Sequence, residues 1–123
     1  MKILVAEDEP GLLNALVLKL NKEGYEVIGT ADGREALKLI ALECPDLIIT
    51  DMMMPYASGF EILAKVKGIT GSRVPVIILS SMGQDNMIEE AFSLGADDYI
   101  TKPFSLNELS VRVNKLAVQH DHF

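Results

Sequence analysis

Short apolar segments that alternate with stretches of helical periodicity constrain this chain more than any other feature. Ile3 to Ala6 is apolar throughout, which is typical of a strand that is buried on both faces of a sheet. The stretches between such segments repeat apolar residues every three or four positions, as amphipathic helices do. We predict five strands, at 3–6, 26–30, 47–50, 74–79 and 98–101.

Helix breakers and capping residues mark the ends of the predicted helices. Pro10 suits the first turn of a helix that ends at Gly24, and Asp32 can cap a second helix that Pro45 cannot continue. The Ser-x-x-Glu spacing of a capping box opens two more helices, at Ser58 and Ser105. Caps included, the predicted helices span 10–24, 32–44, 58–67, 83–94 and 105–118.

This alternation predicts the fold. Consecutive strand–helix units give parallel strands joined by right-handed crossovers, with helices on both faces of the sheet. The fold class is therefore α/β, a doubly wound (βα)5 flavodoxin-like sandwich with a five-stranded parallel sheet in the order 2-1-3-4-5. In such sheets the ligand site lies beyond the carboxyl ends of the strands, between strands 1 and 3. One domain is predicted at 1–118, followed by a tail at 119–123.

Composition excludes several classes of protein. The net charge is −7 and no basic run is present, so direct nucleic-acid binding is not expected. No apolar run approaches the roughly 20 residues of a membrane span, and the first residues do not resemble a signal peptide. We expect a cytoplasmic protein with no membrane contact. The single cysteine, Cys44, is expected to be a packing residue, and His120 and His122 are expected to lie in an exposed tail.

Polar residues follow four of the five predicted strands. An ionised carboxylate at the end of an apolar strand needs a partner, because desolvating its charge is costly. Each group also has a simpler explanation, since acids favour a helix N-terminus and a lysine can be solvated. In a parallel sheet, however, all strand ends lie on one rim, so these groups should converge. They are Glu7 and Asp8, Asp51, Ser80 and Ser81, and Lys102.

The residue types indicate the chemistry of this shared site. Three neighbouring carboxylates raise one another's pKa values unless a cation joins them, and one lysine compensates for only part of their charge. Oxygen ligands without His or Cys suit Mg²⁺ or Mn²⁺. A carboxylate beside a metal, a hydroxyl and an ammonium can accept a phosphoryl group.

From Met1 to about Val118, the sequence resembles the response-regulator receiver domains of two-component signalling. The motifs that carry the resemblance are Glu7-Asp8, Asp51-Met-x-Met-Pro55, Ser80, and Gly95-Ala-Asp-Asp-Tyr-Ile-Thr-Lys-Pro-Phe104. The resemblance implies a domain that takes a phosphoryl group from a histidine kinase or phosphotransfer protein and then controls an output partner or domain. It implies that the protein is not an enzyme and catalyses only its own phosphorylation and slow dephosphorylation.

The resemblance assigns roles to the residues around the expected phosphoacceptor, Asp51. Glu7, Asp8 and Asp51 would hold Mg²⁺ or Mn²⁺ together with the backbone carbonyl of Met53. In the family, the positions of Met53 and Met82 tune the lifetime of the phosphate. Methionine offers no group that orients or activates water, so we expect slow self-dephosphorylation.

Further roles concern binding of the phosphoryl group and the switch that follows. By the resemblance, Ser80 and Lys102 contact the phosphoryl group, and the peptide bond before Pro103 is cis. Tyr99 is the switch aromatic. It would move as Ser80 is drawn to the phosphate, shifting the face made by helix 4, strand 5 and helix 5.

Two departures from the family pattern stand out. Where the family most often has Gly-x-Asp-Gly, this chain has Tyr56-Ala-Ser58-Gly59, with Tyr56 expected to be exposed. The segment Gly95 to Phe104 most resembles receivers of winged-helix transcription factors, which dimerise through charged pairs. The predicted fourth helix has no Arg or Lys, so we expect at most a weak homodimer through this face, or a more apolar partner contact.

Other functions fit the sequence less well. A metal-dependent phosphatase with an Asp nucleophile would need a second acid where Met53 stands. A flavodoxin-like cofactor site would need a phosphate-binding loop where Glu7-Asp8-Glu9 stands. A phosphorylation-independent interaction module is the stronger alternative. Such a module would not need the acids, the hydroxyl and the lysine that this fold would bring together, and their presence counts against it.

Overall fold

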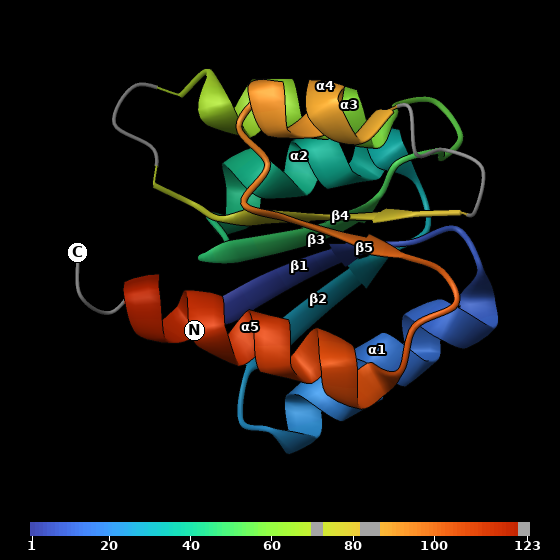
Figure 1. Ribbon diagram of the computed structural model, residues 1–123, viewed down its shortest axis with the longest axis vertical. Coiled ribbons are helices and arrows are strands. Elements are labelled where there is room, and N and C mark those ends of the chain that lie inside the picture. The colour runs from blue at the N-terminus through green and yellow to red at the C-terminus, as the bar shows by residue number, and fades with distance from the viewer. Residues whose placement is uncertain (70–72, 82–86, 121–123) are drawn as a thin grey trace.

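A five-stranded parallel sheet lies at the centre of the molecule (Figure 1). The structure, a computed structural model, describes residues 1–69, 73–81 and 87–120. The strand order is β2-β1-β3-β4-β5, which confirms the predicted doubly wound topology. The strands are β1 (Lys2–Ala6), β2 (Glu26–Thr30), β3 (Leu47–Asp51), β4 (Val76–Ser80) and β5 (Asp98–Thr101).

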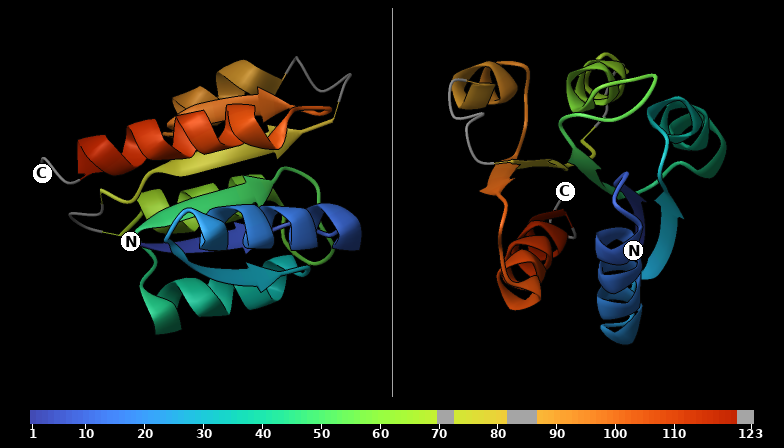
Figure 2. Two further views of the ribbon diagram at one scale, coloured as in Figure 1. Left: turned by 90° about the horizontal axis from the view of Figure 1, so that it is seen from below. Right: turned by 90° about the vertical axis from the view of Figure 1, so that its right-hand side faces the viewer.

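Helices cover both faces of the sheet. Two of them, α1 and α5, lie on one face, and α2, α3 and α4 lie on the other (Figures 1 and 2). Among the described residues, no helix has the length and apolar character needed to cross a membrane. The helices are α1 (Pro10–Lys22), α2 (Gly33–Glu43), α3 (Gly59–Lys67), α4 (Ile88–Ser93) and α5 (Leu106–His120).

The sheet separates two hydrophobic cores. Successive side chains of a strand point to opposite faces, so Ile48 packs toward α2, α3 and α4 while Ile49 packs toward α1 and α5. Every residue of β3 and β4 is buried. Burying one of their aliphatic side chains stabilises the fold by roughly 1.5–3 kcal/mol. The packing of these two cores holds the carboxyl ends of the strands in fixed relative positions.

Side-chain caps fix where the chain enters three of the helices. The Asp32 carboxylate accepts hydrogen bonds from the backbone N–H groups of Arg34 and Glu35 at 2.7 and 3.1 Å. Ser58 and Glu61 form the predicted capping box at α3. The Ser105 hydroxyl accepts from the Glu108 N–H group at 3.0 Å. All three predicted caps are therefore present.

Some details differ from the sequence predictions. Cys44 is exposed, so the expectation that it is a packing residue is wrong. It ends α2 in the left-handed conformation (φ 47°), which places it in the turn and not on the buried stripe of the helix. Residues 83–86 of the predicted fourth helix and residues 121–123 of the predicted tail lie outside the described residues, and α5 continues to His120.

Candidate functional site

Three carboxylates lie together at the carboxyl ends of β1 and β3. Ala6 is paired with Thr50 in the sheet, so the next residues along the two strands, Glu7 and Asp51, come side by side. Asp8 follows Glu7. Oxygen atoms of the three carboxylates lie within 4.8 Å of one another. The structure therefore brings together the acidic cluster that the strand ends predict.

Lys102 bridges two of these carboxylates. It follows β5, and its backbone N–H group donates to the Ser80 carbonyl at 2.7 Å. Its ammonium nitrogen lies 2.8 Å from Glu7 Oε1 and 3.1 Å from Asp51 Oδ2. The peptide bond between Lys102 and Pro103 is cis, as predicted. The contact with Asp51 places Lys102 beside the expected phosphoacceptor, whereas the shorter contact with Glu7 was not predicted.

Burial and charge shift the pKa values of both partners. Glu7 is 0 % exposed, and this burial raises the pKa of its carboxyl group. The nearby Asp51 charge raises the pKa further. Lys102 and the Glu9 N–H group, which donates to Glu7 Oε2 at 3.0 Å, oppose the shift only in part. Burial lowers the pKa of Lys102, but the two carboxylates outweigh it, so the net shift is upward. When all three acids are ionised, the cluster keeps two uncompensated negative charges.

Ser80 ends β4 beside the acidic cluster. Asp51 is paired with Leu79, so Ser80 stands one residue further along the neighbouring strand. Its side chain is fully buried, and its hydroxyl has no hydrogen-bond partner within residues 1–69, 73–81 and 87–120. A buried hydroxyl left unpaired costs about 1–3 kcal/mol. This cost makes Ser80 a candidate donor for a ligand oxygen.

Tyr99 lies on β5, which pairs with the strand that ends at Ser80. It is paired with Ile78 on β4, two positions before the pair formed by Ser80 and Thr101. Its side chain is buried in the core formed with α2, α3 and α4. The ring lies 6.4 Å from the ring of Phe92 on α4, at an angle of 41°. Tyr99 thus connects the strand that ends at the site with the helix that covers it.

The loop after Asp51 exposes two large side chains. Met53 is 56 % exposed and Tyr56 is 72 % exposed, so the prediction for Tyr56 is confirmed. Met82, which is predicted to act with Met53 on phosphate lifetime, lies outside the described residues.

Two glycines that position this loop were missed by the sequence predictions. A Cβ atom at Gly59 would lie 2.6 Å from the Asp51 carbonyl oxygen, and one at Gly33 would lie 2.1 Å from the Ala57 carbonyl oxygen. Each glycine follows a capping residue, Ser58 or Asp32. A glycine directly after a helix cap is the signal that would have identified these close backbone contacts.

A cavity of about 660 Å³ opens beside Lys102. It gives a partner molecule room to approach this side of the cluster. Its lining residues are Glu9, Leu12, Ser81, Lys102, Pro103 and Phe104.

Comparisons with known proteins agree with this geometry. The structure is similar to that of the Francisella response regulator 1452 receiver domain, with a TM-score of 0.86 and 39 % identity, covering 96 % of this chain and 97 % of that one. It also resembles the BeF3-activated N-terminal receiver domain of Klebsiella pneumoniae RstA, with a TM-score of 0.84 and 29 % identity, covering 93 % and 96 % of the two chains.

Curated relatives include longer proteins. The sequence is 40 % identical over 115 residues to the probable transcriptional regulator ycf27 of Cyanophora paradoxa, covering 94 % of this chain and 47 % of that protein. It is 38 % identical over 115 residues to the alkaline phosphatase synthesis transcriptional regulatory protein PhoP of Bacillus subtilis, covering 94 % and 48 %. The chain thus spans about half the length of these relatives.

Residues 3–114 match the family described as the response regulator receiver domain. Members of this family are signalling phosphoacceptors. Sequence, fold and site geometry agree on one assignment: the chain belongs to the response regulator receiver domain family.

Proposed function

We propose that this receiver domain accepts a phosphoryl group on Asp51. The observation that carries the proposal is the position of the Asp51 carboxylate, which lies 3.1 Å from the Lys102 ammonium and within 4.8 Å of two further acids. The unpaired hydroxyl of Ser80 stands at the end of the neighbouring strand. A nucleophile, a cation and a hydrogen-bond donor are therefore available around one point.

The proposed reaction is an in-line phosphoryl transfer. An Asp51 carboxylate oxygen forms a bond to phosphorus, and the bond between phosphorus and the donor's leaving atom breaks. The leaving group, an imidazole from phosphohistidine or a carboxylate from an acyl phosphate, takes the electron pair. Lys102 compensates for charge on the phosphoryl oxygens, and Ser80 donates a hydrogen bond to one of them.

The acidic cluster suits a divalent metal ion. Its net charge of two negative units and its carboxylate oxygens match the preferences of Mg²⁺ or Mn²⁺. Glu7, Asp8, Asp51 and the Met53 carbonyl would hold the ion, directly or through water. When bound, the ion supplies positive charge that neutralises the phosphoryl oxygens.

The switch that follows phosphorylation starts at Ser80 in this proposal. Donation to the phosphoryl group gives the Ser80 hydroxyl the partner that it otherwise lacks among the described residues. A shift of this strand end would change the packing of Tyr99, which contacts Phe92 on α4. The population of two packings of the α4–β5–α5 face would then depend on phosphorylation.

The partners follow from this role. A sensor histidine kinase or a phosphotransfer protein would supply the phosphoryl group, and an output protein or domain would respond to the altered face. Several relatives are named transcriptional regulators, so control of transcription by such an output is part of the proposal. The domain would work in the cytoplasm, where the kinase finds ATP, and would catalyse only its own phosphorylation and its slow loss.

Intact mass spectrometry tests the phosphoacceptor role. The protein is incubated with Mg²⁺ and a small acyl phosphate, and its mass is compared with that of the Asp51→Ala variant. We expect the wild type to gain the mass of one phosphoryl group and the variant to gain none. EDTA should prevent the gain.

Two outcomes would contradict the proposal. If the wild-type protein gains no phosphoryl mass, a phosphorylation-independent interaction module is favoured. An equal gain in Asp51→Ala would show that another residue is the acceptor. Asp46→Ala serves as the matched control, because Asp46 lies at the opposite end of β3 and should not affect the reaction.

A further inference from the structure

Tyr56 has a backbone conformation that is rare for its side chain. Its φ angle is 72°, in the left-handed region, where a bulky residue is an outlier. The side chain is 72 % exposed, so burial does not hold it there. Such strained residues cluster at functional sites and persist only when surrounding contacts determine them. Tyr56 stands in the loop that follows Asp51, and a hydrogen bond from the Ala57 N–H group to the Pro55 carbonyl at 2.9 Å spans it.

Arg34 provides a side-chain contact that helps to hold this conformation. Its guanidinium carbon lies 4.3 Å from the centroid of the Tyr56 ring, within the range of a cation–π interaction. Arg34 belongs to the first turn of α2, whose backbone Asp32 caps. The Arg34 side chain is therefore anchored on a rigid helix end, while the Tyr56 ring belongs to an irregular loop.

The same helix end contacts the loop on both sides of Tyr56. The Gly33 N–H group donates to the Pro55 carbonyl at 3.2 Å, and the Ala57 carbonyl oxygen would lie 2.1 Å from a Cβ atom at Gly33. Figure 1 shows the loop between β3 and α3 beside the first turn of α2. Three consecutive loop residues, 55–57, are thus fixed against α2.

The other part of the loop is tied to the site. The Gly59 N–H group donates to the Met52 carbonyl at 2.8 Å, and the Met52 N–H group donates to the Leu79 carbonyl at 2.8 Å. Met53 lies between these bonds and the segment held by α2. The position of its backbone therefore depends on contacts at both ends of the loop.

We propose that the pair of Arg34 and Tyr56 is a latch that holds the loop at 52–58 in the conformation required for metal binding. The role of the Met53 carbonyl as a metal ligand rests on the proposed function. Arg34 and Tyr56 are positioning residues, since they act through the loop. Without the pair, the backbone hydrogen bonds around Tyr56 offset its strain less completely, and the loop leaves this conformation more often.

Mn²⁺ binding measures the effect without any phosphoryl transfer. Free Mn²⁺ is quantified by electron paramagnetic resonance for the full chain and for Arg34→Ala, Tyr56→Ala and the double variant. We expect each single variant to bind Mn²⁺ about threefold more weakly, which corresponds to an exposed cation–π pair. The double variant should bind no more weakly than either single variant, because the two residues form one interaction.

Two control variants separate the latch from general effects. Lys38→Ala removes one positive charge from the same exposed side of α2, one turn further along, and Tyr56→Phe keeps the aromatic ring. Both should bind Mn²⁺ as the wild type does or slightly more tightly. Loss of a positive charge alone would favour cation binding, so weaker binding by Arg34→Ala cannot arise from net charge.

Amide hydrogen exchange of the metal-free protein, followed by NMR, gives a second readout. Exchange at Gly33 and Ala57 should accelerate in Arg34→Ala and Tyr56→Ala and stay unchanged in Tyr56→Phe. Wild-type Mn²⁺ affinity in Arg34→Ala, additive losses in the double variant, or unchanged exchange would each overturn the latch. Failure of Asp51 to take a phosphoryl group would instead contradict the proposed function, and the metal and exchange results would still decide on the latch.

Discussion

At the scale of single residues, Glu7 lies in an environment that disfavours its ionised form. It is fully buried and lies beside Asp51, and both effects favour its protonated form. The Lys102 ammonium, 2.8 Å away, compensates for part of this cost. A bound divalent ion would compensate for more. An ionised Glu7 therefore destabilises the metal-free protein, and the proposed metal site would offset this cost.

This environment predicts a pH-dependent effect of Glu7→Gln. The folded state raises the pKa of Glu7, so the folded protein binds more protons than the unfolded chain between the unfolded and folded pKa values. The stability contributed by protonated Glu7 is present below the unfolded pKa and is lost as pH rises through the folded pKa. In EDTA, Glu7→Gln should therefore gain stability relative to wild type as pH rises through this window. Urea unfolding at several pH values measures the difference, and a constant difference would contradict the account.

A second prediction concerns the lifetime of the phosphate. Met53, which is more than half exposed, and Met82 offer no group that orients water. The variant carrying Met53→Asn and Met82→Glu should lose phosphate from Asp51 about tenfold or more faster, because Asn and Glu can orient water; a fully positioned acid or base contributes roughly 10²–10⁴-fold. The decay of the phosphorylated protein is followed by intact mass after donor removal. Equal decay in wild type and variant would refute this role.

The convergence of the polar groups could be predicted because each one ends or follows a strand and parallel strand ends share one rim. Asp51 and Lys102 are within contact distance, as this argument expects. The bridge from Lys102 to Glu7 could not be predicted, since it depends on which carboxylate is buried. The exposure of Cys44 was missed because the left-handed turn that ends α2 leaves no clear signal in Glu43-Cys-Pro45.

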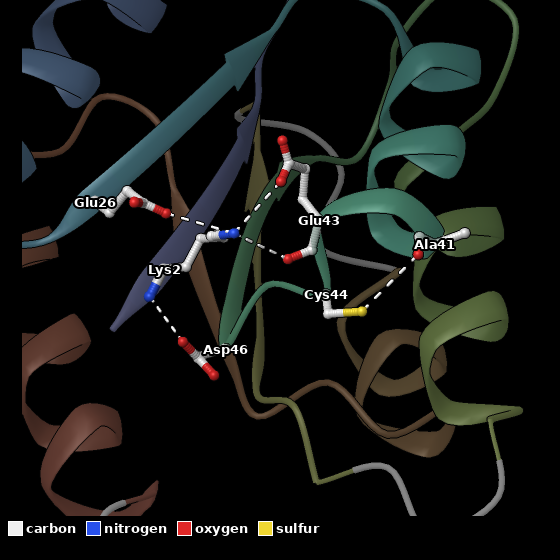
Figure 3. A network of polar contacts seen from close by, with 6 residues as sticks. All are labelled: Lys2, Glu26, Ala41, Glu43, Cys44 and Asp46. Atoms are coloured by element: carbon white, nitrogen blue, oxygen red, sulfur yellow. Dashed lines mark hydrogen bonds and ion pairs between the residues drawn. The ribbon is translucent and has the colours of Figure 1, made fainter.

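At the scale of secondary-structure elements, the start of β1 is held at the end of the sheet opposite the site. The Lys2 N–H group donates to the Asp46 carboxylate at 2.8 Å, and the Asp46 N–H group donates to the Lys2 carbonyl at 2.7 Å. The Lys2 ammonium also reaches Glu43 and Glu26, at 3.3 and 3.5 Å (Figure 3). These contacts join β1, β2, α2 and β3.

Asp46→Ala should therefore destabilise the protein by about 1 kcal/mol, because the Lys2 N–H group loses its acceptor. Glu26→Ala is the matched control. Its ion pair with Lys2 is long and exposed, so its removal should change stability by less than about 0.5 kcal/mol. Urea unfolding with an unchanged m-value tests both variants. Equal effects would show that the backbone hydrogen bond does not matter.

Helix starts were easier to predict than strand limits at this scale. Asp32, Ser58 and Ser105 all cap their helices, because a side-chain oxygen that accepts a first-turn N–H group is a local interaction. β4 begins at Val76 and includes Ser80, whereas the prediction was 74–79. Pairing with β3 and β5 sets these limits, and such contacts are not visible in the local sequence.

At the scale of the whole molecule, the fold could be predicted almost completely. Apolar strand segments such as Leu47 to Ile49, buried on both faces, leave few alternatives to a parallel sheet covered by helices. Recognition surfaces were harder to predict, because they depend on which charges are already paired. On α5, Arg112 binds Asp98 at 2.7 Å and Glu108 at 3.3 Å within the same chain.

This pairing predicts a weak association of activated molecules. Lys67 is likewise paired with Asp97 at 3.0 Å, so a charged dimer through α4, β5 and α5 would first have to break these contacts. The predicted α4 contributes Glu89 and Glu90 but no basic residue. Sedimentation of the beryllofluoride-treated domain at micromolar concentration should therefore show a monomer, with Arg112→Ala unchanged. A tight symmetric dimer would be the contrary result.

The central claim, that Asp51 is the phosphoacceptor, is tested most directly by locating the phosphate. Borohydride reduces an aspartyl phosphate to homoserine, which marks the modified residue permanently. The tryptic peptide at 39–65 contains both Asp46 and Asp51, so fragment masses can distinguish them. We predict homoserine at position 51 after incubation with Mg²⁺ and an acyl phosphate, and unmodified Asp46. Homoserine at any other position, or none at all, would contradict the account.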